Sequence, residues 1–218
     1  MSSPNRVRSY FDREARRFDA IYENRKPLIQ RVMDRFFRGI ILRRFQLVCN
    51  LAPLPGTWTV LDIGCGSGRY AVALCRSGAS RVVGLDVAPA MVELARREVE
   101  RAGFAARSEF LLGDFHDYRS EEEFDVVLAM GYFDYLENPL SHLQRMVAVC
   151  RGRIFASFPK RWEWRAPTRK LRFLALGSFV RFYSQRQIQS LVAGAGLAPD
   201  RAPLIDLGRD WILVARTR

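Results

Sequence analysis

The sequence has little of several residue types, and each shortage argues against a class of protein. Only four of its 218 residues are cysteines, and Cys49, Cys65, Cys75 and Cys150 show no close paired spacing. This argues against a disulfide framework and against zinc or iron–sulfur sites, so we expect no bound metal. No stretch approaches the roughly 20 apolar residues of a membrane span, and the first 25 residues lack the apolar core of a signal peptide. We therefore expect a soluble, cytoplasmic protein.

Acidic residues and lysines are also scarce. The chain has 23 acidic against 35 basic side chains, a net charge of +12 and a pI near 10.3, and only Lys26, Lys160 and Lys170 are lysines. The excess lies in residues 1–50 and 151–186, which carry +7 and +9, while the remainder has 13 basic and 17 acidic side chains. Such a charge favours nucleic acid, an anionic membrane or a negatively charged small molecule as partner. An arginine-rich codon bias would produce the same composition.

The pattern of apolar residues predicts one α/β domain. Apolar residues make up 49% of the chain, enough for a single well-filled core. From about residue 58, short β-branched runs alternate with amphipathic stretches, which is typical of a parallel sheet covered by helices. We predict strands at 57–63, 81–86, 109–112, 125–129, 153–157 and 211–215, and a weaker strand at 202–207. We predict helices at 69–77, 89–103, 139–150 and 185–194, the last with a capping box of Ser184 and Gln187.

A glycine-rich loop follows the first predicted strand. In VLDIGCGSGRY, at 60–70, an apolar strand leads into Gly64, Gly66 and Gly68 and then into a helix. Such glycines allow a tight turn and let a ligand approach the backbone and the helix N-terminus, so we expect a nucleotide-like ligand. Arg69 stands where the dinucleotide fingerprint G-x-G-x-x-G has its third glycine, which argues against a nicotinamide or flavin cofactor.

Carboxylates and a glycine mark the ends of the predicted strands. Asp62 lies in the first strand, Asp86 ends the second, Asp114 follows the third, and Met130 and Gly131 follow the fourth. The carboxyl ends of parallel strands meet at one edge of the sheet, and ligands of doubly wound folds bind in the crevice there. At the end of the second strand, Asp86 is placed to accept hydrogen bonds from both hydroxyls of a ribose.

Together these motifs resemble the class I S-adenosylmethionine-dependent methyltransferases, in order and in spacing, over residues 55–160. The resemblance implies a Rossmann-like α/β fold, a doubly wound, mostly parallel sheet of seven strands whose last strand is antiparallel. It implies S-adenosylmethionine as cofactor, with the methionine end at Asp62 and Gly64, the ribose at Asp86 and the adenine at Asp114 and Phe115. The complete set of implied cofactor residues is Asp62, Gly64, Cys65, Gly66, Gly68, Asp86, Val87, Met91, Asp114, Phe115 and Met130. A doubly wound fold that binds another nucleotide is the alternative.

The resemblance is less specific about the methyl acceptor. AMGYFDY at 129–135 lacks the Asn/Asp-Pro-Pro-Tyr/Phe signature of enzymes that methylate nucleobase amines or glutamine amides. It is more similar to small-molecule O-methyltransferases of the ubiquinone-biosynthesis and magnesium-protoporphyrin types. FPKR at 158–161 and RFYS at 181–184 loosely resemble the magnesium-protoporphyrin branch, which has histidine where this chain has Asp134.

An acceptor hydroxyl or acid must lose a proton, so we expect a general base near the end of the fourth strand. Asp134, Tyr132 and Tyr135 lie there, and we prefer Asp134. A helix-capping or solvent-facing role is the alternative for this aspartate. His142 and His116 are the other catalytic candidates, and a structural role, which is the commoner one at such positions, is the alternative for both.

We expect two regions outside the motifs. Residues 1–50 form a helical N-terminal cap over the active site, and residues 51–218 form the methyltransferase domain with a basic lid inserted at about 160–183. The family folds these positive segments over the acceptor side, so we expect a small anionic or lipid-like acceptor methylated at oxygen. LRFLALGSFVRF at 171–182 could instead rest on an anionic membrane. An RNA methyltransferase and a non-catalytic nucleotide-binding interaction protein are the alternative functions.

Overall fold

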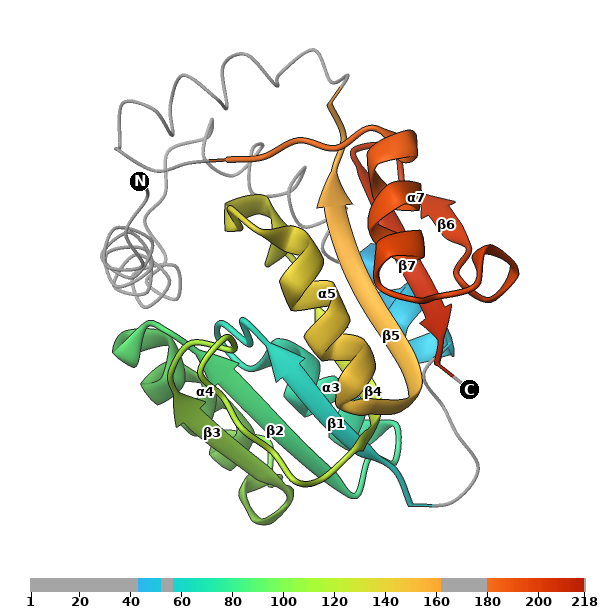
Figure 1. The fold of residues 1–218 in the computed structure, drawn as a ribbon. Coiled ribbons are helices and arrows are strands. Elements are labelled where there is room, and N and C mark those ends of the chain that lie inside the picture. The colour runs from blue at the N-terminus through green and yellow to red at the C-terminus, as the bar shows by residue number, and fades with distance from the viewer. Residues whose placement is uncertain (1–42, 52–56, 162–179, 218) are drawn as a thin grey trace.

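The fold is a seven-stranded sheet between two layers of helices (Figure 1). The computed structural model describes residues 43–51, 57–161 and 180–217. The strand order is β3-β2-β1-β4-β5-β7-β6, with β1 to β5 parallel and β7 antiparallel to both β5 and β6. The strands are β1 Thr59–Ile63, β2 Arg81–Asp86, β3 Ser108–Leu112, β4 Phe124–Ala129, β5 Cys150–Pro159, β6 Leu204–Asp206 and β7 Asp210–Arg216. This confirms the predicted doubly wound sheet and its antiparallel last strand.

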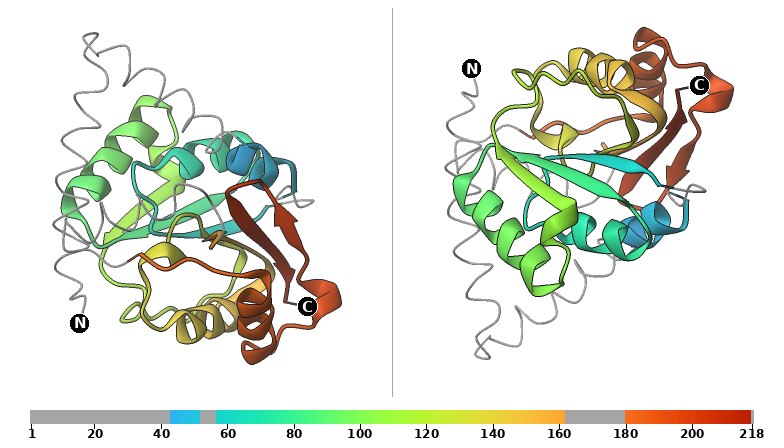
Figure 2. Two further views of the ribbon diagram at one scale, coloured as in Figure 1. Left: turned by 90° about the horizontal axis from the view of Figure 1, so that it is seen from above. Right: turned by 90° about the horizontal axis from the view of Figure 1, so that it is seen from below.

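The helices divide between the two faces of the sheet, with α3 and α4 on one face and α5 and α7 on the other (Figure 2). Within residues 57–161 and 180–217 the α-helices are α3 Arg69–Arg76, α4 Pro89–Arg101, α5 Pro139–Ala148 and α7 Gln185–Gly194, and the short 3-10 helices are η2 Ala105–Arg107, η3 Phe133–Tyr135 and η4 Pro199–Arg201. Side chains at the N-cap positions fix where α5 and α7 begin. The Asn138 side chain accepts from the Ser141 backbone N–H ahead of α5, and Ser184 and Gln187 form the predicted capping box of α7.

Two apolar cores lie on the two faces of the sheet. Leu61 and Ile63 of β1 contribute to the core under α5 and α7, whereas Val60 contributes to the core under α3 and α4. Because alternate residues of a strand point to opposite faces, a strand buried on both faces is a continuous apolar run. The rigid centre of the sheet therefore fixes where the strands end, and with them the loops of the site.

Strand β5 begins earlier than predicted, at Cys150 instead of residue 153. A Cβ atom at Gly152 would lie 2.3 Å from the backbone oxygen of Asp125, and the register of β4 with β5 is irregular between Phe124 and Val126. Glycine at position 152 is thus required by the close approach of the neighbouring strand.

Residues 43–51 form a helix that packs beside α3. Val48 is fully buried in the same core as Trp58, and the ring of Phe45 lies 5.6 Å from that of Tyr70. The rest of the predicted N-terminal cap, most of the predicted lid and most of segment 171–182 lie outside the described residues. Among the helices of residues 43–51, 57–161 and 180–217, none is long and apolar enough to cross a membrane.

Candidate cofactor site and active site

The glycine loop joins β1 to α3 and is tied to the neighbouring strand. The backbone N–H groups of Gly64 and Cys65 both donate to the Leu85 oxygen of β2, at 2.7 and 3.1 Å. Gly68 has a φ of 73°, and a Cβ atom there would lie 3.0 Å from the Cα of Ala95 in α4. Only glycine meets both conditions, so the loop is held close to both β2 and α4.

Asp86 lies at the centre of the site. Its Oδ2 accepts from the Gly66 N–H and its Oδ1 from the Ala88 N–H, both at 2.9 Å. These two hydrogen bonds fix the carboxylate between the glycine loop and the start of α4. The residue is 9% exposed, so the carboxylate is oriented before any ligand arrives. This is the position from which an acidic residue of a doubly wound fold binds ribose hydroxyls.

Asp62 is a buried carboxylate with an unpartnered oxygen. The residue is 1% exposed, and its Oδ2 has no hydrogen-bond partner among the described residues. Burial, together with the negative charge of Asp86, raises the pKa of Asp62 to about 7. A buried oxygen without a partner is costly and is therefore typical of a site completed by a ligand. A positively charged ligand group would satisfy the oxygen and offset both causes of the raised pKa.

The loop after β3 holds the next pair of predicted cofactor residues. Asp114 Oδ1 accepts from the His116 N–H at 2.8 Å, which closes a tight turn. Phe115 is 1% exposed and lies with its ring 6.5 Å from that of Tyr118. The guanidinium carbon of Arg145, on α5, lies 5.3 Å from the centre of the Phe115 ring. The loop is therefore fixed by packing against α5.

The remaining predicted cofactor residues line the same edge of the sheet. Met91 and Cys65 are buried at 3% and 5% exposure, while Val87 and Met130 are partly exposed next to the ends of β2 and β4. Burial, followed by the charges of Asp62 and Asp86, raises the pKa of the Cys65 thiol well above its usual value. This thiol is a packing group rather than a nucleophile at neutral pH.

Tyr132 and His142 are brought together by the fold. The Tyr132 hydroxyl lies 2.9 Å from His142 Nδ1, and the rings of His116 and His142 are 5.9 Å apart. Burial lowers the pKa of His142 and raises that of Tyr132, so at neutral pH both are uncharged. A Cβ atom at Gly64 would lie 3.2 Å from the Tyr132 ring, so this ring lies directly against the glycine loop.

Asp134 lies in different surroundings from Tyr132 and His142. It is on η3, is 3% exposed, and its backbone oxygen accepts from the Arg181 N–H at 2.8 Å. Its charge acts on Arg44 and on Tyr183, which belong to the helix at 43–51 and the segment before α7. The predicted catalytic residues therefore form two groups.

Arg44 and Asp210 are residues that the sequence analysis missed. Arg44 Nε donates to Asp210 Oδ2 at 3.1 Å, Arg44 Nη2 lies 2.5 Å from the same oxygen, and the side chains are 16% and 3% exposed. Burial acts to lower the pKa of Arg44, but the charges of Asp210 and Asp134 outweigh it and raise the pKa. Asp210 begins β7, and because β7 is antiparallel its start lies at the edge where the parallel strands end. The expected antiparallel last strand could therefore have pointed to Asp210 from the sequence alone.

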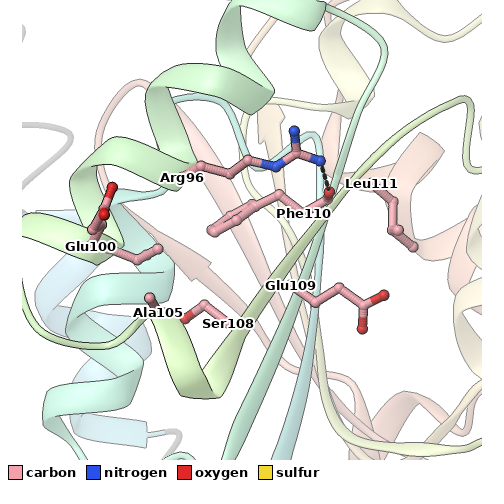
Figure 3. A pocket seen from close by; sticks show the side chains of 8 residues that line it. Arg96, Glu100, Ala105, Ser108, Glu109, Phe110 and Leu111 are labelled. Atoms are coloured by element: carbon pink, nitrogen blue, oxygen red, sulfur yellow. Dashed lines mark hydrogen bonds between the residues drawn. The ribbon is translucent and has the colours of Figure 1, made fainter.

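A search for metal-binding groups and for pockets adds no residue to the predicted cofactor and catalytic sites. In the described part of the chain, no group of three or more His, Cys, Asp or Glu side chains could hold a metal ion. A surface pocket of about 460 Å³ lies between α4 and the edge strand β3, where Arg96 Nη2 donates to the Phe110 oxygen at 2.8 Å (Figure 3). None of its lining residues belongs to the predicted site.

Comparison with known proteins finds methyltransferases among the proteins that this chain resembles. Residues 60–152 match a family described as methyltransferase domain, which confirms the resemblance drawn from the motifs. Ribosomal protein L11 methyltransferase of Escherichia coli (strain 55989) is 36% identical over 91 residues, which are 42% of this chain. The chain spans only 29% of the length of that relative.

Solved structures share the whole fold. Magnesium protoporphyrin IX methyltransferase from Synechocystis PCC 6803 with bound SAH has a TM-score of 0.75 at 20% identity, over 96% of this chain and 97% of that chain. The mitomycin 7-O-methyltransferase MmcR has a TM-score of 0.65 at 22% identity, over 91% of this chain and 60% of that chain. At these identities the likeness establishes the fold.

Proposed function

We propose that this chain, whose residues 60–152 form a methyltransferase domain, transfers a methyl group from S-adenosylmethionine to an oxygen of a small anionic or lipid-like acceptor. One observation carries the proposal. The Asp86 carboxylate is fixed by the Gly66 and Ala88 N–H groups, next to the buried, unpartnered oxygen of Asp62. In a cofactor with a ribose and a positively charged methionine end, the ribose hydroxyls would donate to Asp86 and the charged end would pair with the unpartnered oxygen of Asp62.

Different residues at the carboxyl edge of the sheet would bind different parts of S-adenosylmethionine. Asp62 and Gly64 would hold the methionine end, Asp86 the ribose, and Asp114 with Phe115 the adenine. The orphan oxygen of Asp62 supports the first assignment, because the ammonium of a methionine group is a donor and a cation. When bound, the cofactor supplies a methyl group on a positively charged sulfonium. The protein holds the acceptor against it, and such positioning supplies much of the rate.

On the acceptor side, Asp134 is the proposed general base. It is buried on η3, just beyond the end of β4, and its charge interacts with Arg44. Tyr132 and His142 are hydrogen-bonded to each other, and both are neutral at pH 7. Because the raised pKa of Tyr132 keeps its proton in place, this side chain suits the role of a donor better than that of a base.

Charge and structural likeness support a small anionic acceptor. The described residues carry 20 basic and 17 acidic side chains, so +9 of the net +12 belongs to residues 1–42, 52–56, 162–179 and 218. Two proteins of the same fold are named as methyltransferases of magnesium protoporphyrin IX and of mitomycin at the 7-oxygen. Both are small-molecule enzymes, which favours that class here.

Calorimetry with S-adenosylhomocysteine tests cofactor binding, and a screen of candidate acceptors that measures release of S-adenosylhomocysteine tests the reaction. We expect binding by the wild-type chain and turnover with an anionic small molecule. Asp134→Asn should lower turnover by about a hundredfold, within the usual range for loss of a general base. Wild-type protein that does not bind S-adenosylhomocysteine would refute the function, and full turnover by Asp134→Asn would refute the base.

RNA is the second candidate acceptor, and the net charge of +12 is the observation that favours it. Basic side chains that neutralise phosphates make binding strongly salt-dependent. Filter binding with bulk RNA at two salt concentrations separates the two candidates. Tight binding that weakens steeply with salt would support RNA, and weak binding at both concentrations would leave the small-molecule acceptor.

A further inference from the structure

The guanidinium of Arg44 is held along one of its edges and is open along another. Nε donates to Asp210 Oδ2 at 3.1 Å, and Nη2 lies 2.5 Å from the same oxygen. Because the guanidinium is a planar fork, an anion bound at Nε and Nη2 leaves the N–H groups of Nη1 to other partners. Within the described residues, Nη1 forms no hydrogen bond or ion pair. The side chain is 16% exposed, so this is a largely buried cation with an open pair of donors.

The open donors lie over the end of β4, next to the glycine loop. Nη1 is 3.8 Å from the point where a Cβ atom of Gly131 would be. Gly131 has a φ of 78°, which favours glycine, and its lack of a side chain leaves this space to the guanidinium. The next residue is Tyr132, whose ring would lie 3.2 Å from a Cβ atom of Gly64. Two adjacent residues, Gly131 and Tyr132, thus contact the guanidinium on one side and the glycine loop on the other.

The helix that carries Arg44 is fixed to the same loop. The ring of Phe45 lies 5.6 Å from that of Tyr70, the second residue of α3, which follows the glycine loop. Val48 belongs to the same apolar core as Cys65 of the loop. Packing of this helix and the pair with Asp210 therefore fix the place of the guanidinium before any ligand is bound.

The methionine end of the proposed cofactor carries two charges, an ammonium and a carboxylate. Asp62, on β1 beside β4, suits the ammonium through its buried, unpartnered oxygen, but it would repel the carboxylate. The first two N–H groups of the glycine loop, those of Gly64 and Cys65, already donate to the Leu85 oxygen. A carboxylate that is buried without donors or a cation is strongly destabilised, so this end of the cofactor needs a further donor.

We propose that Arg44 binds the carboxylate at the methionine end of S-adenosylmethionine through Nη1, while Asp62 binds the ammonium. This inference rests on the proposed function, in which S-adenosylmethionine is the cofactor. Hydrogen bonds between a guanidinium and a carboxylate are among the strong ones. Asp210 holds the guanidinium in place for this contact. A residue outside the matched family domain at 60–152 thus contributes to the cofactor site.

Calorimetry with a set of related ligands tests this pairing of charges. The ligands are S-adenosylhomocysteine, an analogue in which hydrogen replaces the carboxylate, and an analogue in which hydrogen replaces the ammonium. Arg44→Met should weaken the binding of S-adenosylhomocysteine by about tenfold to a hundredfold, the range for a lost hydrogen bond between charged groups. It should leave the affinity for the decarboxylated analogue within about twofold of the wild-type value.

Asp62→Asn should give the opposite selectivity when the same ligands are measured at about pH 8, where Asp62 is ionised because its pKa is about 7. It should weaken the binding of S-adenosylhomocysteine and of the decarboxylated analogue, and leave the binding of the analogue without an ammonium unchanged. The two variants together show which charge of the ligand meets which side chain.

Two control variants separate binding from folding. Arg43→Met removes the same charge from an exposed neighbouring position of the same helix, and it should change neither affinity. Arg44→Met leaves the buried carboxylate of Asp210 unpaired, which destabilises the fold. Arg44→Met combined with Asp210→Asn removes that unpaired charge, so it should show the selective loss even if Arg44→Met alone folds poorly.

The selectivity decides the inference. Equal losses for S-adenosylhomocysteine and the decarboxylated analogue would show that Arg44 only holds its helix in place, and no loss for either would show that it does not reach the ligand. Each of these results overturns the inference and leaves the proposed function standing, because the wild type still binds S-adenosylhomocysteine. Wild-type protein that does not bind S-adenosylhomocysteine overturns the proposed function, and this inference with it.

Discussion

On the proposed cofactor side of the sheet edge, the Asp86 carboxylate is held by the backbone, whereas on the proposed acceptor side the Asp210 carboxylate is held by a side chain that is distant in the sequence. Asp86 accepts from the N–H groups of Gly66 and Ala88, 20 and 2 residues away along the chain. Asp210 is paired with Arg44, which is 166 residues away. A hydrogen bond from a backbone N–H depends on the conformation of the loop, so it survives many substitutions of the donor's side chain. A pair of two side chains is lost when either one is substituted. The proposed cofactor side thus depends on main-chain groups, whereas the proposed acceptor side depends on one pair of side chains.

The largest expected effect is at the anchor of the cofactor side. Asp86→Ala removes the acceptor of two backbone hydrogen bonds and both proposed bonds to the ribose, and charge-assisted hydrogen bonds are among the strong ones. Affinity for S-adenosylhomocysteine should fall by about a thousandfold or more in calorimetry. Circular dichroism should show an unchanged fold, and retained affinity would contradict the assignment of the ribose site.

Asp62→Asn should change how the stability of the ligand-free protein depends on pH. Folded Asp62 keeps its proton up to about pH 7, whereas an unfolded carboxyl group loses it near pH 4. The folded state therefore binds more protons between these values, and wild-type stability falls as pH rises through this window. Asp62→Asn removes that loss, so its gain over the wild type should grow by up to about 4 kcal/mol between pH 4 and pH 8.

Urea titration at several pH values measures this difference, and Asp125→Asn is the matched control. The hydrogen bond from Arg151 is the main cause that lowers the pKa of Asp125. Its contribution is complete above the usual aspartate range and is lost only below it. The difference between Asp125→Asn and the wild type should therefore stay constant from pH 5 to pH 8. A constant difference for Asp62→Asn over the same window would show that Asp62 is not a protonated buried acid.

Tyr132→Phe should have a smaller effect. It removes the hydroxyl bonded to His142 but keeps the ring that lies against Gly64, so unfolding should cost about 1 kcal/mol less. Affinity for S-adenosylhomocysteine should change by no more than about threefold, which corresponds to less than one net hydrogen bond. A loss of turnover as large as that of Asp134→Asn would place the catalytic group on the Tyr132 side.

The smallest expected effect is that of a chelator. EDTA should leave turnover unchanged, because the proposed reaction uses a carboxylate base and no divalent metal. The measurement is turnover with and without EDTA, once an acceptor is known. A loss that magnesium restores would show that the acceptor side holds a metal as well as Arg44.

Short-range signals account for what the sequence predicted. The glycine spacing, the strand-end carboxylates and the capping box of Ser184 and Gln187 are set by a few neighbouring residues, and each is present as expected. The ion pair of Arg44 with Asp210 depends on where a helix docks across the sheet, which periodicity does not specify. The raised pKa of Asp62 depends on complete burial next to Asp86 and could likewise come only from the folded structure.

The point where the chain leaves β5 lies beside the segment that leads into α7. The Arg161 N–H donates to the Tyr183 oxygen, the Tyr183 N–H donates to the Pro159 oxygen, and Lys160 and Tyr183 form a β-bridge. These bonds join main-chain groups, so a substitution that keeps the backbone N–H leaves them in place. The Tyr183 hydroxyl also donates to the Phe133 oxygen at 2.9 Å. The end of β5 and the turn after β4 are therefore both tied to one tyrosine, and its replacement by phenylalanine would release the turn while the contact with β5 remains.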